Sequence, residues 1–184
     1  MVTGRTRSGL HRLAADQRGL SAVEFALILP VMLGLFFASV ELGDALTIDR
    51  KVNIVTSTLA DLVAQTKEIT DTDMANIFNA ATSIMTPYPT TSLKLKVTGV
   101  NIDASSNVTV AWSYAQNDTA LAKGSTVSLP SALVQASTFL VMSEVHYPYT
   151  PSVGYVMTGT YDLTNKFYLS PRVSTKVCDN TPSC

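Results

Sequence analysis

Charged residues are scarce in this chain of 184 residues. They make up 15% of it, and 13 Lys+Arg against 14 Asp+Glu give a formal net charge of -1. A dedicated nucleic-acid binder needs a basic face to meet phosphates, so this balance excludes one. With 46% apolar residues, the chain is too apolar and too weakly charged for intrinsic disorder. Its two cysteines exclude a small scaffold held by many disulfides.

Residues that usually carry catalysis are also few. The histidines are His11 and His146, and neither stands near another metal-ligand type at a recognised spacing. The sequence has no glycine-rich phosphate loop, no zinc-ligand spacing and no Gly-x-Ser-x-Gly turn. Asp71 and Asp73 are explained by the start of a helix. We therefore expect a protein that is not an enzyme and has no cofactor or metal site.

A long apolar run stands out against this background. Leu20–Val40 holds 21 residues with one charge, Glu24. As a helix it would span roughly 31 Å at about 1.5 Å per residue, the thickness of a bilayer's hydrocarbon core. We predict a transmembrane helix over residues 20–43, bent at Pro30, whose ring clashes with the carbonyl of Ala26.

The residues before the run set its orientation. Residues 1–19 form a basic leader, with Arg5, Arg7, Arg12 and Arg18 against Asp16. By the positive-inside rule the leader stays cytoplasmic and residues 44–184 form a periplasmic domain. A secretory signal peptide fits poorly, because the run is too long, contains Pro30 and is followed by no small-x-small cleavage site.

Glu24 is the most informative residue, because a carboxylate in a membrane helix costs about 3 kcal/mol or more and tends to have a partner. One interpretation is that Glu24 reaches the interface and pairs with Arg18. Another interpretation follows from spacing, because Glu24 is the fifth residue after Gly19. This arrangement resembles a prepilin peptidase site, in which a basic leader ends in Gly and a Glu stands at the fifth mature position of an apolar helix.

The stretch Gly19–Pro30, with sequence GLSAVEFALILP, resembles the opening of TadE/TadG-like proteins, minor pseudopilins of the tight-adherence (Tad) branch of type IV pili. Phe25 takes the aromatic position that follows the Glu in that family. Residues 146–151 resemble its late aromatic-Pro strand end, and 170–174 its closing Pro-Arg segment. The resemblance implies cleavage between Gly19 and Leu20, and contact of Glu24 with a neighbouring subunit's new amino terminus.

The resemblance also implies a role and partners. The role is assembly or initiation of an adhesive Tad pilus from a single-pass protein of the bacterial inner membrane. The partners are the prepilin peptidase, the major Tad pilin, other minor pseudopilins and inner-membrane platform proteins. The alternative is an uncleaved, membrane-anchored periplasmic binding or sensing module, whose ligand surface includes the polar loop at 116–135.

The remaining chain predicts an α+β, pilin-like domain with an antiparallel sheet. Apolar residues at helical spacing extend the membrane helix as an amphipathic stalk to about Thr66, docked on the domain's sheet or on a partner helix. A capping box at Thr70 and Asp73 starts a second helix, which Pro87 and Pro89 end. The stalk stripe consists of Ile48, Val52, Val55, Leu59 and Leu62.

Apolar and polar residues alternate on either side of a polar turn at 103–107, and this pattern predicts a β-hairpin. Further strands are expected at 139–147, 155–160 and 166–169. Cys178 and Cys184 stand at the end of the chain, and we expect them to form a disulfide in the oxidising periplasm.

Overall fold

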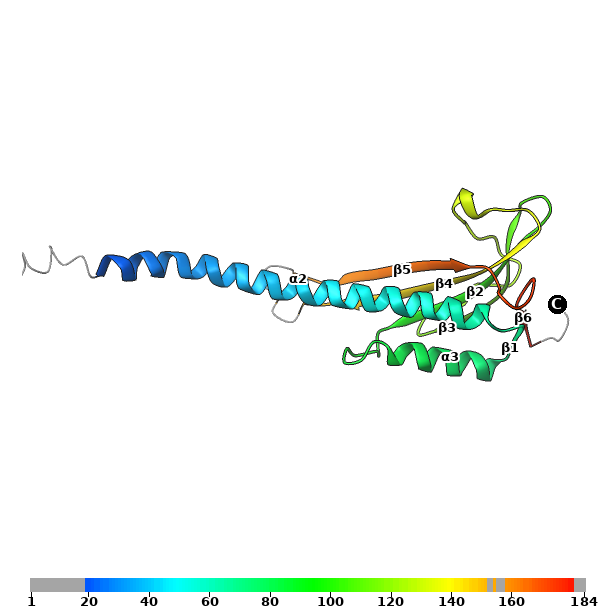
Figure 1. The fold of residues 1–184 in the computed structure, drawn as a ribbon, viewed down its shortest axis with the longest axis horizontal. Helices are drawn as coiled ribbons and strands as arrows, with labels where there is room; N and C mark the ends of the chain where they lie inside the picture. The colour runs from blue at the N-terminus through cyan, green and yellow to red at the C-terminus, as the bar shows by residue number, and fades with distance from the viewer. Residues whose placement is uncertain (1–18, 152–153, 155–157, 181–184) are drawn as a thin grey trace, which may run out of the picture. The chain divides into compact units, whose positions relative to one another are not determined.

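The computed structural model describes residues 19–151, 154 and 158–180. Its elements are α2 (Leu20–Ala64), β1 (Glu68–Ile69), α3 (Asp71–Ser83), β2 (Lys94–Ile102), β3 (Val108–Gln116), the short 3-10 helix η2 (Ser131–Leu133), β4 (Thr138–Tyr149), β5 (Tyr161–Leu169) and β6 (Cys178–Asp179). The chain divides into two compact units, residues 1–43 with 151–158, and residues 44–150 with 159–184. The predicted α+β class is confirmed. Figure 1 shows α3 and the second half of α2 running alongside the strands.

The second half of α2 packs on the sheet of its own domain. Ile48, Val52, Val55 and Leu59 are buried in the same core cluster as Val97 and Val141 of the sheet, so the predicted stripe docks as expected. The prediction of Leu62 as the last member of the stripe is wrong, since Leu62 is only half-buried while Val63 is fully buried. The predicted steps average 3.5 residues, whereas an α-helix turns every 3.6, so the predicted stripe drifts by about 40° over these two heptads and leaves the buried face at its end.

Helix α3 begins at the predicted capping box. Thr70 Oγ1 accepts the Asp73 N–H at 3.2 Å, and the Asp73 carboxylate accepts the Thr70 N–H at 3.1 Å. The Thr70 hydroxyl also donates to the Asp73 carboxylate at 2.7 Å, and this bond, together with the one from the Thr70 N–H, lowers the pKa of Asp73. At the other end, the Lys51 ammonium donates to the carbonyls of Ile84 and Thr86 at 2.8 and 2.9 Å. These contacts tie the turn after α3 to α2, and Met74, Phe78 and Ala81 face the core.

The main sheet has the order β3-β2-β4-β5 and is antiparallel throughout. The predicted hairpin is confirmed as β2 and β3, and Asp103 closes its turn by accepting the N–H groups of Ser105 and Asn107, both at 2.8 Å. Strand β5 is longer than the predicted 166–169. The strand predicted at 155–160 falls partly outside the described residues, and residues 158–160 are not in a strand.

The segment between β3 and β4, predicted as a long polar loop, is attached to the edge of β3. The Leu121 N–H donates to Ser113 Oγ at 3.1 Å, and the Val110 N–H donates to the Ser125 carbonyl at 2.9 Å. Thr126 forms an isolated bridge with Thr109. These bonds satisfy backbone and side-chain groups on an edge strand that would otherwise be open to pairing.

The C-terminal segment returns to the end of α2 and to β1, an arrangement not predicted from the sequence. The Arg172 N–H donates to the Ala64 carbonyl at 2.8 Å at the end of α2, and its guanidinium lies 2.7 Å from the Asp61 carboxylate. The Pro-Arg segment thus caps a helix end, where a cation is favourable. Farther on, β6 pairs in parallel with β1.

Trp112 joins the hairpin to this C-terminal segment. Its indole Nε1 donates to the Val177 carbonyl at 2.7 Å, and its ring lies against the backbone of Gly99. A Cβ on Gly99 would approach Trp112 Cε2 to 2.4 Å and Phe139 Cζ to 2.8 Å, closer than real Cβ atoms come. Glycine is therefore required at position 99 for Trp112 to reach Val177.

We predict that Gly99→Ala destabilises the domain by about 1–3 kcal/mol, because the added methyl overpacks the contact with Trp112. Thermal and denaturant unfolding of the full chain in detergent, followed by circular dichroism, measures the change. Gly43→Ala is the control, since its Cβ meets no atom within 4 Å and alanine is a better helix former. Equal stability of Gly99→Ala and wild type would contradict the packing argument.

Candidate functional site

The first half of α2 is an exposed apolar helix. It is long and apolar enough to cross a membrane, and none of its most apolar 18-residue window is buried. Large apolar side chains stand exposed on every side of it, as expected of a helix that meets lipid. Exposed examples are Leu20, Val23, Phe25, Leu27, Ile28, Val31, Met32, Leu35 and Phe36. This N-terminal helix suggests a single membrane anchor.

The predicted cleavage position lies where the helix begins. Gly19 is exposed directly before α2, and a Cβ placed on it would meet no atom within 4 Å. Leu20 is the first helical residue and is 57% exposed. The residues on both sides of the predicted cleavage point are therefore exposed. The basic leader, residues 1–18, lies outside the described residues.

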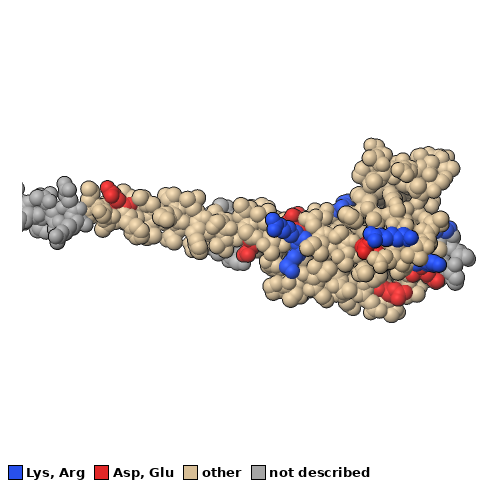
Figure 2. All heavy atoms as spheres, viewed as in Figure 1, with Lys and Arg blue, Asp and Glu red and all other residues tan. Residues whose placement is uncertain are grey.

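Glu24 lies one turn into α2 and is the only charged residue between Leu20 and Val40. Its side chain is exposed, and Figure 2 shows the acidic colour near the start of an otherwise uncharged stretch. Residues four apart share a face of a helix, so Leu20 and Glu24 stack along one side. Arg18 lies outside the described residues, so its pairing with Glu24 stays a prediction.

Small residues and one proline form a row along α2, and this row was not predicted from the sequence. At four-residue spacing these are Ala22, Ala26, Pro30, Gly34 and Ala38. Around Gly34 the helix surface carries a groove of about 250 Å³, lined by Leu29, Pro30, Leu33, Gly34 and Phe37. Small residues at this spacing let membrane helices approach closely. The periodicity was readable from the sequence and points to helix packing.

The first two members of this row lie on the side of the helix away from the carboxylate. At 3.6 residues per turn, Glu24 lies about 200° around the axis from Ala22 and from Ala26, whereas each further four-residue step turns by about 40° and brings Gly34 and Ala38 to within about 80° and 40° of Glu24. The helix can therefore contact one neighbour through Glu24 and another through Ala22 and Ala26. Pro30 lies inside α2, which runs unbroken from Leu20 to Ala64. The bend at Pro30 stays a prediction.

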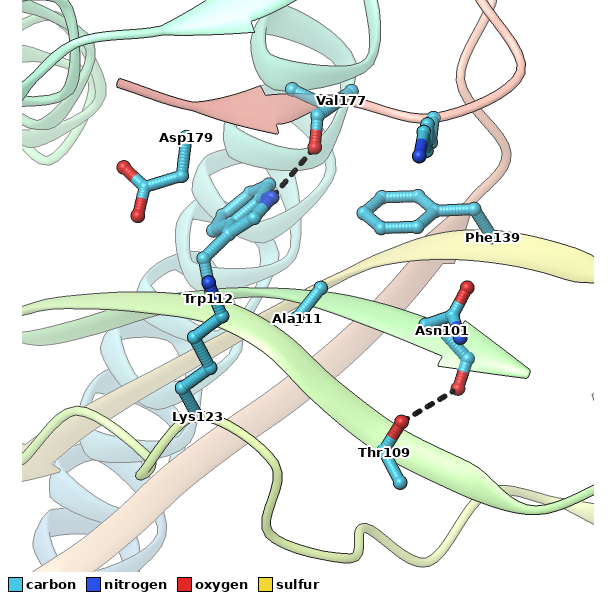
Figure 3. A pocket seen from close by; sticks show the side chains of 9 residues that line it. Asn101, Thr109, Ala111, Trp112, Lys123, Phe139, Val177 and Asp179 are labelled. Atoms are coloured by element: carbon cyan, nitrogen blue, oxygen red, sulfur yellow. Dashed lines mark hydrogen bonds between the residues drawn. The ribbon is translucent and has the colours of Figure 1, made fainter. Parts of the chain in front are cut away.

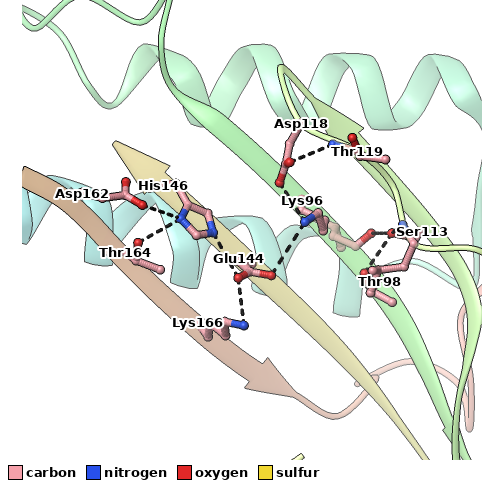
Figure 4. A network of polar contacts seen from close by, with 12 residues as sticks. Lys96, Thr98, Ser113, Asp118, Thr119, Glu144, His146, Asp162, Thr164 and Lys166 are labelled. Atoms are coloured by element: carbon pink, nitrogen blue, oxygen red, sulfur yellow. Dashed lines mark hydrogen bonds and ion pairs between the residues drawn. The ribbon is translucent and has the colours of Figure 1, made fainter. Parts of the chain in front are cut away.

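A charged network lies on the face of the sheet opposite α2 (Figure 4). Ser143 faces α2, because its hydroxyl donates to the Thr56 carbonyl at 2.7 Å, so its neighbour Glu144 points to the other face. Lys166 lies 2.8 Å from the Glu144 carboxylate, and Lys96 lies 4.0 Å from it. These contacts join β2, β4 and β5.

His146 belongs to the same network. Its Nε2 lies 3.0 Å from Glu144 Oε1 and its Nδ1 lies 3.1 Å from Asp162 Oδ2, so both ring nitrogens face a carboxylate. Thr164 Oγ1 lies 2.9 Å from Nδ1. The contacts of His146 with Asp162 and Thr164 join β4 to β5, and its contact with Glu144 lies within β4. We interpret His146 as a member of these contacts between strands.

The expected disulfide involves one described residue. Cys178 lies in β6, where its N–H donates to the Lys67 carbonyl at 3.0 Å. Cys184 lies outside the described residues, so its pairing with Cys178 stays a prediction.

The segment that contains the candidate site matches the model of a known protein family. The family model described as TadE-like protein matches residues 19–61. This segment begins at Gly19 and contains Leu20, Glu24, Phe25 and Pro30, so the resemblance read from those residues is confirmed. The match supports involvement in a Tad pilus system. Neither a curated protein nor a solved structure matches the chain.

The network on the sheet predicts a loss of stability in acid. Burial acts to raise the pKa of Glu144, but hydrogen bonds from Lys166 and His146 outweigh it and lower the pKa below 4.5. A carboxyl pKa that is lower in the folded than in the unfolded state stabilises the folded protein at pH values above the unfolded-state pKa. This stabilisation is lost as pH falls through the folded-state pKa. We expect Glu144→Gln to flatten the fall in stability below about pH 4.5. Denaturant unfolding at a series of pH values measures it, and an unchanged fall would contradict the assignment.

Proposed function

We propose that this chain is a minor pseudopilin, cleaved by a prepilin peptidase between Gly19 and Leu20, that acts in assembly or initiation of an adhesive Tad pilus. The observation that carries the proposal is Glu24, an isolated carboxylate on an exposed apolar helix, five residues after Gly19 and inside the matched segment. An anchor that only holds a domain at the membrane has no use for a carboxylate there, because it costs about 3 kcal/mol or more.

Cleavage would supply the partner that Glu24 needs. It would leave an ammonium on Leu20 at the N-terminal end of α2, where the helix dipole disfavours positive charge. A neighbouring subunit's Glu24 would compensate that ammonium in a low dielectric, where leaving either charge unpaired is costly. The pair would therefore fix the register of adjacent helices more than it adds net stability.

The two sides of α2 support assembly over simple anchoring. Glu24 would meet one neighbour, while Ala22 and Ala26 on the other side would pack against another. Contacts on two sides are what a subunit inside a bundle of helices requires. The proposed neighbours are the major Tad pilin, other minor pseudopilins and inner-membrane platform proteins, and we assign the chain no catalytic role.

The remaining assignments follow from the sequence and the membrane. The basic leader would stay in the cytoplasm, and the domain from residue 44 onward would lie in the periplasm. There Cys178 and Cys184 would form a disulfide that closes a seven-residue loop, worth about 2.4 kcal/mol in the chain-entropy treatment.

The N-terminus of the membrane-extracted protein tests the cleavage. We expect intact mass and terminal peptide sequencing to show a chain that starts at Leu20, and a chain that starts at Met1 when the peptidase is deleted. A start at Met1 in both strains would contradict the proposal and favour the uncleaved, membrane-anchored binding module.

Glu24→Gln tests the assembly role, because it keeps the shape of the side chain and removes its charge. We expect normal membrane insertion and a loss of surface pili of at least about tenfold, since an unpaired ammonium in low dielectric costs about 3 kcal/mol or more. Glu68→Gln, at an exposed position outside α2, is the matched control and should leave pili unchanged. Wild-type piliation with Glu24→Gln would contradict the register role.

A further inference from the structure

A pocket of about 310 Å³ lies in the sheet domain, between the β2–β3 hairpin and the C-terminal segment (Figure 3). Its walls come from β2, β3, the start of β4, the segment after β3 and the residues around β6. All of these belong to the same compact unit. The volume is at the lower end of the range for small-molecule sites. Nothing derived above for membrane insertion or pilus assembly uses this pocket.

The floor of the pocket is aromatic. The rings of Trp112 and Phe139 lie 6.5 Å apart between centroids with 39° between their planes, and both line the cavity. The Trp112 N–H is engaged by the Val177 carbonyl at 2.7 Å. The floor therefore offers carbon surface and no free polar atom, which suits the apolar body of a ligand.

The rim of the pocket carries hydrogen-bond donors. Lys123, Lys176 and Asn101 line it and are exposed, and Figure 3 shows Lys123 extending toward Trp112. Across residues 19–151, 154 and 158–180, none of the hydrogen bonds or ion pairs engages either ammonium or the Asn101 side-chain amide. By contrast, Lys96, Lys166 and Arg172 each have a carboxylate partner within 3 Å.

Asp179, the carboxylate among the residues that line the pocket, is held by the pocket wall. Its Oδ1 accepts the hydroxyl proton of Tyr114. Among the described residues, no lining group accepts a hydrogen bond from the two ammonium groups or the amide. A ligand that complements this rim must bring acceptor atoms and negative charge.

We propose that the pocket lined by Trp112, Phe139, Lys123 and Lys176 binds a small anionic ligand, with a carboxylate or phosphate between the two lysines and a compact ring or apolar body over the aromatic floor. A hexose that carries an acidic group has this chemistry and this size. The proposal is independent of pilus assembly, because it concerns neither α2 nor the cleavage site.

Trp112 provides the measurement, because it is the only tryptophan of the chain. The full-length protein in detergent is titrated with glucuronate, glucose 6-phosphate and glucose, with selective excitation of tryptophan fluorescence. We expect a saturable change with one or both acids and none with neutral glucose. The carboxylate and the phosphate share one ring, so the two acids show which group the rim prefers. No saturable change with either acid, or the same change with glucose, would overturn the proposal.

Lysine variants locate the binding. We expect Lys123→Gln and Lys176→Gln each to weaken binding of the preferred acid by at least about tenfold, the usual effect of losing a charged hydrogen bond. Lys94→Gln, at an exposed lysine of β2 that does not line the pocket, is the matched control and should bind like wild type. Both pocket lysines are exposed, so neither variant should change folding, and the circular dichroism of each verifies this. Equal binding by all three variants would overturn the assignment.

Discussion

Helix α2 has to meet two environments within one continuous helix from Leu20 to Ala64. Its first half carries exposed apolar side chains on every side, which only lipid or other apolar helices can cover. Its second half buries a narrow stripe, from Ile48 to Val63, against the sheet. The rest of the domain depends on that second contact, because α3 packs into the same core and the C-terminal segment caps the end of α2 through Arg172.

Between Leu20 and Val40, Glu24 is the one charge, and its cost decides how the helix is interpreted. A buried ion pair adds little net stability, but a lone buried charge is strongly unfavourable, so such a pair selects one arrangement over others. This logic links three local facts: an exposed glycine before the helix, a carboxylate one turn inside it, and the small residues Ala22 and Ala26 on the opposite side. Together they describe a helix suited to a bundle of similar helices, in agreement with its match to TadE-like protein.

Much of the fold follows from local sequence patterns. The capping box at Thr70, the hairpin around residues 103–107 and the stripe on α2 were predicted, because each depends on residues close together in the chain. The pairing of β1 with β6 was not, since two strands of two residues each carry no periodicity and meet only through the fold. The same holds for the contact of Trp112 with Val177, which depends on Gly99, and for the pocket beside it. In the candidate site, Gly19, Leu20 and Glu24 were predicted because they belong to a recognisable motif. The small-residue row has a clear period in the sequence, but the sides of the helix that it occupies follow only from the helix geometry.

Zero-length chemical cross-linking tests the pairing of Glu24 most directly. A membrane-permeant carbodiimide joins a carboxylate to an amine in contact with it, and mass spectrometry of assembled complexes identifies the joined peptides. The account predicts an amide between Glu24 and the amino terminus of a neighbouring mature subunit. Glu144 and Lys166, 2.8 Å apart, provide an internal positive control. Recovery of the Glu144–Lys166 product without any product from Glu24 to an amino terminus would contradict the account.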